Sequence, residues 1–156
     1  MTENVHPAPD AIDRRILREV QADIGRPVPA IADAVGISVS AYRRRLTRLR
    51  KAGVVLREVA LVDSAQLGIE IIVAITMMEE QSSGYDRLKR RIRSAPEVTQ
   101  CYSVTGDVDL IAHVTMPDMA TYEQWIQDFI LSDPAVRRCN SHVVYSRVKF
   151  TTAVPV

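Results

Sequence analysis

The chain has 156 residues, of which 47% are hydrophobic and 25% are charged, and its formal net charge is +1. This length allows one domain with a sizeable core or two small domains. No run of about 18 apolar residues could span a membrane, and residues 1–10 contain two prolines, Glu3 and no apolar run, unlike a signal peptide. We therefore expect a cytoplasmic protein with no membrane partner.

Charge is divided unevenly along the chain. Residues 1–60 carry eleven Lys and Arg against seven Asp and Glu, a net of +4, whereas residues 61–156 carry nine against twelve, a net of −3. A basic first part and an acidic second part indicate two domains with different partners. The two cysteines, Cys101 and Cys139, show no CxxC spacing and do not make a disulfide framework, so we expect partly buried free thiols.

Two short helices are predicted near the start of the chain. Asp10 offers an N-cap for a helix over 10–23, and apolar residues at helical spacing mark the side that it buries. Gly25 ends this helix. A second, briefer helix is expected over 29–35, and Gly36 breaks it. Short helices joined by a glycine at the second turn are typical of a helix-turn-helix.

The third helix is the most informative stretch of the chain. We expect it to be capped by Ser38 or Ser40 and to end near Gly53. Its apolar seam follows helical spacing, at Tyr42, Leu46, Leu49 and Gly53. Its other side is dense in cations, which repel one another unless anions lie opposite them, and DNA phosphates are such anions. The alternative is a solvated basic face, but the place of this helix in a three-helix unit favours DNA contact.

Each cation of the third helix is given a role by its position. Residues near the amino end of such a helix face base edges in the major groove, and this predicts base contacts for Ser40, Ala41, Arg43 and Arg44. Phosphate contacts are expected from Arg48, Arg50 and Lys51, and at the helix start from Ser38 or Ser40. Arg45 lies close to the apolar seam and is expected to pair within the domain, with Asp13 or Asp33.

Strands and helices alternate after the third helix. Residues 54–63 are rich in β-branched side chains and predict a strand that links the two parts of the chain. The expected elements that follow are a strand over 69–78, a helix over 85–95, strands over 98–104 and 110–116, a helix over 119–131 and a last strand from 136 to about 149. The order β-α-β-β-α-β from residue 69 predicts the split βαβ, ferredoxin-like arrangement.

An enzyme is the first alternative from another class. Cys101 with His113 or His142 could form a Cys–His pair, but both histidines fall within strand patterns, where lone histidines are usually structural or on the surface. The sequence contains no HExxH, GxSxG or phosphate-loop motif. Three scattered histidines also lack metal-ligand spacing. We therefore expect no catalytic residue, no metal site and no cofactor.

From Asp10 to its end the chain resembles the Lrp/AsnC (feast/famine) family of bacterial and archaeal regulators. Its opening helix is similar to the family's D-x-x-D-x-x-I-L-x-x-L-Q at Asp10, Asp13, Ile16, Leu17, Val20 and Gln21. Its third helix resembles G-[LI]-S-x(6)-R-[VIL]-x-x-L-x-x-x-G-[VI]-I at Gly36, Ile37, Ser38, Arg45, Leu46, Leu49, Gly53 and Val54. The block from Cys101 to Leu110 resembles C-x-x-V-[TS]-G-x-x-D. The three blocks in this order are highly specific.

The resemblance implies an α+β architecture in two domains. A winged-helix-like helix-turn-helix domain is expected to be joined by a strand linker to a C-terminal βαββαβ ferredoxin-like domain. The expected boundaries are a flexible tail over 1–9, the DNA-binding domain over 10–54, the linker over 55–68 and the ligand-binding and oligomerisation domain over 69–156. Such domains dimerise through their sheets, and the dimers gather into higher oligomers.

The resemblance also implies an effector, commonly an amino acid, bound between dimers near the hairpin that holds the G-x-x-D. A zwitterion needs hydrogen-bond donors for its carboxylate, which glycine and turn amides supply, and an acceptor for its ammonium group. Asp109 is the favoured acceptor and Asp107 the other. The expected site residues are Tyr102, Val104, Thr105, Gly106, Asp107, Val108, Asp109 and, on the last strand, Ser141. The alternative reading of this glycine and these aspartates is ordinary hairpin chemistry.

These expectations combine into one function. Dimers of a sequence-specific regulator would present two third helices to successive major grooves of a near-palindromic operator in double-stranded DNA. A small effector, by expectation an amino acid, would change the assembly of the homo-oligomer or its DNA binding. The alternative is an architectural, nucleoid-associated DNA-binding protein that responds to no effector.

Overall fold

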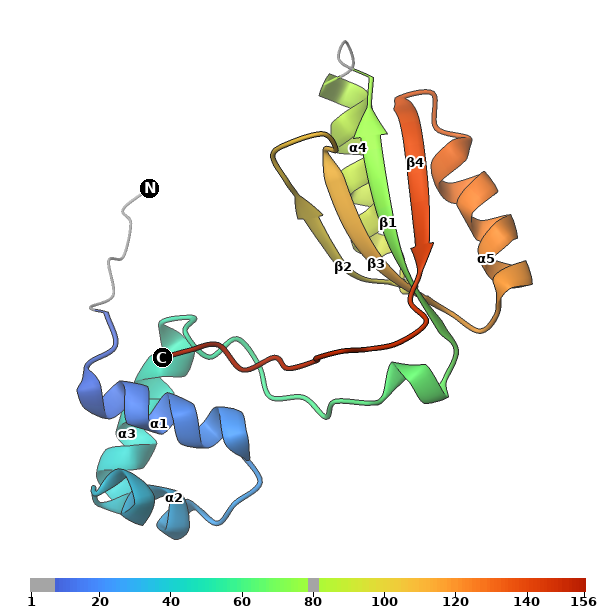
Figure 1. Ribbon diagram of the computed structural model, residues 1–156. Coiled ribbons are helices and arrows are strands. Elements are labelled where there is room, and N and C mark those ends of the chain that lie inside the picture. The colour runs from blue at the N-terminus through green and yellow to red at the C-terminus, as the bar shows by residue number, and fades with distance from the viewer. Residues whose placement is uncertain (1–7, 79–81) are drawn as a thin grey trace. The chain divides into compact units, whose positions relative to one another are not determined.

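The computed structural model describes residues 8–78 and 82–156. The chain splits into two compact units (Figure 1). The helical unit contains the residues up to Leu61 together with Lys149–Val156, and the sheet unit contains Val62–Val148. The last eight residues thus group with the helices, whereas the sequence analysis placed them in the C-terminal domain. Two connections of the chain therefore join the units, one after Leu61 and one after Val148.

The helical unit is built from α1 (Ala11–Ala22), α2 (Val28–Val35) and α3 (Val39–Lys51). A capping box begins α1: the Asp10 carboxylate accepts a hydrogen bond from the Asp13 N–H at 2.8 Å, and the Asp13 carboxylate accepts one from the Asp10 N–H at 3.0 Å. This arrangement satisfies two backbone donors that a helix start otherwise leaves free. The Asp10 cap expected from the sequence is confirmed.

A tight turn leads from α2 into α3. Gly36 has a φ of 75°, in the left-handed region that favours glycine at the end of a helix. Ser38 is the N-cap of α3, since its hydroxyl accepts the Ala41 N–H at 3.2 Å. The buried core between the helices consists of Ile16, Leu17, Ile31, Ala32, Val35, Tyr42, Leu46 and Leu49. This core holds α3 with its apolar seam inward.

The sheet unit has the predicted β-α-β-β-α-β order. Its elements are β1 (Ile69–Met77), α4 (Ser82–Ser94), β2 (Val98–Ser103), β3 (Leu110–Met116), α5 (Met119–Ile126) and β4 (Val136–Val143). A π-helical turn, η2 (Gln127–Leu131), continues α5. The strands lie in the order β2-β3-β1-β4, and each neighbouring pair is antiparallel. The expected α+β, ferredoxin-like arrangement is confirmed.

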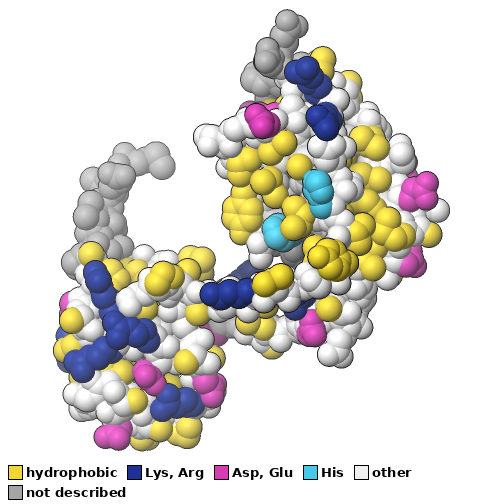
Figure 2. Space-filling model, viewed as in Figure 1, with side chains coloured by type: hydrophobic (Ala, Val, Ile, Leu, Met, Phe, Trp, Pro, Cys, Tyr) yellow, Lys and Arg dark blue, Asp and Glu magenta, His cyan; other side chains and the backbone are white. Residues whose placement is uncertain are grey.

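The two faces of this sheet differ. The buried residues of β1 and β3 pack with α4 and α5, in a cluster of Ile71, Val73, Ile75, Met77, Leu88, Ile92, Leu110, Ala112, Val114, Met116, Tyr122, Ile126, Ile130 and Ala135. The other face carries Ile72, with His113 on β3 and His142 on β4 paired opposite it. Figure 2 shows the two histidines among hydrophobic side chains. Cys101 pairs with Ala112 and so belongs to the helix-covered face. This alternation separates Cys101 from both histidines.

The segment that follows α3 differs from its prediction. Residues 54–63 were expected to form a strand, but no strand is assigned there, and a short 3₁₀ helix, η1 (Ser64–Gln66), follows. A strand needs a neighbour that pairs with its N–H and C=O groups, and within 8–78 and 82–156 no other segment pairs with this one. The last strand also ends earlier than predicted, at Val143 instead of about residue 149.

A buried ion cluster fixes α4 to the loop after η2. Asp133 is 4% exposed, and its carboxylate accepts hydrogen bonds from Arg87 at 2.7 Å and from Arg91 at 3.2 Å. The hydrogen bond from Arg87 is the main reason why the pKa of Asp133 is lowered.

Among the described helices, none combines the length and apolar character that crossing a bilayer requires.

Candidate functional site

Four of the basic side chains of α3 lie on one exposed face. Arg43, Arg44, Thr47, Arg48 and Lys51 line a shallow hollow of about 490 Å³ on the helical unit. Lys and Arg side chains gather on this unit in Figure 2. Thr47 was missed by the sequence analysis, although it stands four residues after Arg43 and four before Lys51 and so shares their side of the helix. The face therefore offers four cations and one hydroxyl.

Three of the predicted DNA-binding cations remain available on this face. Arg43, Arg44 and Lys51 are exposed and make no ion pair within residues 8–78 and 82–156. Ser40 is also exposed and lies at the amino end of α3, where its hydroxyl is 3.1 Å from that of Ser38. Ala41 is half-buried beside them. Arginines near the amino end of a recognition helix are the side chains that can read guanine edges in the major groove.

Two other arginines that are expected to contact phosphates form ion pairs within the chain. Arg48 donates to the Asp13 carboxylate, and Arg50 donates to Glu58. Arg48 keeps half of its side chain exposed, so only part of its guanidinium is engaged. Arg57 lies with Arg50 along a second shallow hollow just beyond α3. It is a further exposed cation that the sequence analysis did not select.

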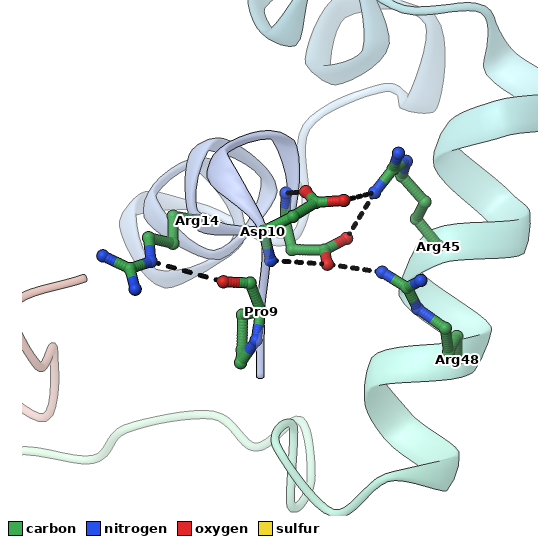
Figure 3. Close-up of polar contacts among 6 residues, drawn as sticks. Pro9, Asp10, Arg14, Arg45 and Arg48 are labelled. Atoms are coloured by element: carbon green, nitrogen blue, oxygen red, sulfur yellow. Dashed lines mark hydrogen bonds and ion pairs between the residues drawn. The ribbon is translucent and has the colours of Figure 1, made fainter. Parts of the chain in front are cut away.

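A carboxylate pair on α1 anchors the carboxyl half of α3 (Figure 3). Arg45 Nη1 lies 2.6 Å from Asp10 Oδ2 and 2.9 Å from Asp13 Oδ1. Asp13 is 1% exposed and also accepts from Arg48. The predicted pairing of Arg45 with an acid of its own domain is confirmed, with Asp13 rather than Asp33 as the partner. The same carboxylates thus cap α1 and fix the direction of α3.

Each charged partner of the anchor stabilises the ionised form of the other. The hydrogen bond from Arg45 is the main reason why the pKa of Asp10 is lowered to about 2, and the backbone N–H of Asp13 lowers it further. The same interaction raises the pKa of Arg45 above its ordinary value. The interaction with Arg45 therefore favours the ionised form of Asp10.

The predicted effector turn joins β2 to β3. The Val104 N–H donates to the Asp109 carbonyl at 3.1 Å and closes the turn, and Gly106 takes a φ of 115°. Thr105, Gly106 and Asp107 are exposed, whereas Val108 and Asp109 are half-buried. The turn is therefore open on the surface of a single chain, and a second surface is needed to enclose a ligand there.

Asp109 already has a partner in the fold. Its Oδ2 accepts the Met77 N–H at 2.7 Å, at the point where the pairing of β1 with β4 shifts register. The Asp109 N–H in turn donates to the Ile75 carbonyl at 2.9 Å. This residue therefore ties the turn to the end of β1, a role that the motif alone did not predict. One oxygen engaged in this way leaves the second carboxylate oxygen available to a ligand.

Two outlying members of the predicted effector site have other neighbours. Ser141 pairs with Val73 on the helix-covered face, and its hydroxyl hydrogen-bonds to the hydroxyl of Tyr122 on α5. Tyr102 pairs with Ile111 on the opposite face, where its hydroxyl donates to Gln100 at 2.9 Å. The sheet alternation thus separates Ser141 from Tyr102.

No cluster of three or more metal-binding side chains occurs among the residues with described positions.

Comparisons with known proteins match both units. Residues 70–154 match the family model described as the Lrp/AsnC ligand binding domain, and residues 9–55 match winged helix-turn-helix DNA-binding. The uncharacterized HTH-type transcriptional regulator y4tD of Sinorhizobium fredii is 37% identical over 94% of this chain and 88% of its own. The DNA-binding transcriptional activator DecR of Escherichia coli is 28% identical over 94% of this chain and 98% of its own.

A solved structure shows the same arrangement of elements. The transcriptional regulator NMB0573 of Neisseria meningitidis, in complex with L-Met, superimposes with a TM-score of 0.86 at 27% sequence identity. The match covers 94% of this chain and 96% of that protein.

Proposed function

Because the chain belongs to the Lrp/AsnC family of transcriptional regulators, we propose that it recognises specific DNA sites through α3 and that an amino-acid effector modulates its assembly or its DNA binding. The observation that carries the DNA-binding part is the exposed basic face of α3, with Arg43, Arg44 and Lys51 free of ion pairs among the described residues. A helix-turn-helix presents this face to the major groove. The DNA is double-stranded, and a near-palindromic site suits a two-fold symmetric dimer.

The base-reading role of Arg44 is tested by Arg44→Ala. If Arg44 contacts a guanine, operator affinity falls by about 1–3 kcal/mol and specificity relaxes at one base position. Arg93→Ala is the matched control, because Arg93 is an exposed helical arginine of the sheet unit. Fluorescence anisotropy on a selected operator measures both variants. Equal affinity of Arg44→Ala and the control would remove Arg44 from the contacts.

Phosphate contacts have a different signature. Lys51→Ala weakens binding to all sequences alike and lowers the slope of log K against log salt by about one unit. A variant that instead changes the preferred sequence contradicts a phosphate role for Lys51. Footprinting separates the two functions considered from the sequence: a local protected site supports the regulator, and uniform coverage supports the architectural protein.

The proposed effector site is the turn over 105–109. Its support is the combination of an exposed glycine turn, the Asp109 carboxylate, of which only Oδ2 has a hydrogen-bond partner within residues 8–78 and 82–156, and the nearby exposed Asp107. Turn amides would hold the carboxylate of an amino acid, and Asp109 or Asp107 would hold its ammonium group. The relative NMB0573 was solved with L-Met, and by analogy we extend an amino-acid ligand to this chain.

A thermal-shift screen of the twenty amino acids tests this site. A ligand that binds the folded state raises the midpoint of unfolding. Asp109→Ala should abolish the response to the ligand and leave basal DNA binding intact, because the DNA-binding face belongs to the other unit. Calorimetry that finds unchanged ligand affinity in Asp109→Ala would place the pocket elsewhere.

We propose homodimers and higher oligomers as the working assembly. The support is the uncovered sheet face with Ile72 and Ile111, together with Leu56 and Leu61 in the segment that follows α3, which are 88% and 59% accessible in the single chain. Apolar surface of this kind is costly in water unless another surface covers it. Light scattering at several concentrations measures the mass, and a monomer throughout would contradict the proposal.

A further inference from the structure

The last residues of the chain are bound to α1. The side chain amide of Gln21 donates through Nε2 to the Val154 carbonyl at 3.1 Å and accepts the Val154 N–H through Oε1 at 2.7 Å. Arg18 Nε donates to the main-chain oxygen of Val156 at 3.0 Å. Gln21 thus offers an extended peptide the same donor and acceptor pair that a neighbouring strand would offer.

Apolar packing accompanies these hydrogen bonds. The Val156 side chain is half-buried and packs against the core shared by α1, α2 and α3. Figure 1 shows the red C-terminal segment reaching the helices of this unit. Lys149–Val156 accordingly belongs to the compact helical unit even though it follows the sheet unit in sequence.

The segment begins at a fixed point of the sheet unit. Arg147, two residues before it, donates to Asp63 at 3.0 Å, to Ser64 at 2.8 Å and to Glu70 at 2.7 Å. Asp63 and Ser64 lie just after the first connection between the units, and Arg147 lies just before the second. Within the sheet unit, the starting points of the two connections are therefore held together.

We infer that residues 149–156 act as a positioning strap, docked on the Arg18 and Gln21 side of α1 of the same chain, that holds the DNA-binding unit in the form presented to DNA. This inference rests on the proposed DNA-binding function. The occupant of the α1 site is the chain's own segment, because Val154, Val156 and α1 are in contact in one chain.

The strap reaches α3 through contacts already described. Gln21 and Arg18 stand on α1, and the first turn of α1 holds Arg45 and Arg48 of α3 through Asp10 and Asp13. A rigid helix connects the two sets of contacts. Loss of the strap therefore loosens α1 and, through it, the direction of α3.

The first experiment measures amide hydrogen exchange in full-length Gln21→Leu. Leucine keeps the helix propensity of the side chain and removes both hydrogen bonds to Val154. We expect the amides of Ala153, Val154 and Val156 and those of α1 and α3 to exchange about fivefold to thirtyfold faster. Gln124→Leu is the matched control, since Gln124 is an exposed glutamine on α5. Equal exchange in the two variants would overturn the strap.

The second measurement is DNA affinity of the same variants. Gln21→Leu should bind the operator about threefold to thirtyfold more weakly than Gln124→Leu. Faster exchange with unchanged affinity would show a docked segment that does not position α3, and would overturn the inference. If the unaltered protein binds no DNA, the proposed function fails, and the exchange of α3 in Gln21→Leu still decides whether the strap holds that helix.

A cross-link identifies the chain to which the segment belongs. In Gln21→Cys/Val154→Cys, a cleavable bis-maleimide joins the two positions, and the product is read on a denaturing gel. A cross-linked single chain, with operator affinity that falls when the linker is cleaved, supports the strap. A cross-linked dimer would show that the segment docks on a second copy and would overturn the inference. The unaltered protein, with Cys101 and Cys139 partly buried, controls for the reagent.

Discussion

Replacement of Asp13 by asparagine tests the anchor between α1 and α3. The Asp13 carboxylate is 1% exposed and accepts from the Asp10 N–H, from Arg45 and from Arg48. Asparagine is not a neutral copy of this group. If its oxygen takes the place of Oδ2, toward the Asp10 N–H and Arg48, its NH₂ takes the place of Oδ1 and faces the Arg45 guanidinium, which also only donates. One amide oxygen remains to serve three donors.

The expected loss follows from the exposure of each partner. Breaking a fully buried ion pair costs about 3–5 kcal/mol, but the side chain of Arg48 is half exposed and loses little. Arg45 is 22% exposed and retains Asp10 at 2.6 Å. The Asp10 N–H retains an acceptor in the side chain oxygen of the new asparagine. We therefore expect the free energy of unfolding of the helical unit to fall by about 2–3 kcal/mol.

Hydrogen exchange of the slowest amides in α1 and α3 measures this loss, because such amides exchange only when their unit opens. A loss of 2–3 kcal/mol accelerates them by about 30-fold to 140-fold. The fluorescence of Trp125, which packs in the sheet unit, reports whether that unit is unaffected.

Asp33→Asn is the matched control for Asp13→Asn. Asp33 is an exposed acid on α2 that makes no ion pair within the described part of the chain, and its change alters net charge by the same amount. We expect it to shift stability by less than about 0.5 kcal/mol. If the two variants exchange at equal rates, the anchor does not hold α3, and no described contact links the strap on α1 to the DNA-binding helix.

Three further predictions follow from single groups. Carbon NMR of the Asp10 carboxyl group should show a titration midpoint near pH 2, and Arg45→Leu should return this midpoint toward 3.8. The pKa of Asp10 is lower in the folded state than in the unfolded state. The contribution of ionised Asp10 to stability is therefore present above about pH 4 and is lost as the pH falls through 2. Burial raises the pKa of Cys139 to about 11, so its thiol should resist alkylation at pH 8 until the protein unfolds, and rapid labelling of the native protein would refute this. In Gly68→Ala the new Cβ would stand 2.1 Å from the Met116 carbonyl oxygen, so urea unfolding followed by tryptophan fluorescence should show a loss of about 1–3 kcal/mol, and an unchanged midpoint would contradict the close approach.

Periodicity explains why most of the fold could be predicted. The strand over 110–116 alternates buried and half-buried residues along its whole length, and its predicted bounds are those observed. Helix ends were predicted to within a few residues because Asp10 and Gly36 carry unambiguous local chemistry. Residues 54–63 form no strand although their β-branched composition favours one, because composition does not supply the neighbour with which a strand must pair.

The site shows the limit of local reasoning. The exposed face of α3 follows from helical spacing, so its free cations could be predicted from the sequence. The engagement of Arg48 depends on an acid 35 residues away, and that of Asp109 on a backbone N–H 32 residues away. Gln21 lies 133 residues from Val154. These three contacts depend on the assembled tertiary structure, and no motif in the sequence predicts them.

The split composition of the helical unit has a consequence for synthesis. Residues 149–156 leave the ribosome only after every strand of the sheet unit has been translated. The first three helices can gather as soon as they emerge, but they lack their final packing partner until translation has passed residue 148. The helical unit, which carries α3, is therefore completed only after the sheet unit has been translated. A chain that terminates before residue 149 lacks the last segment of the helical unit.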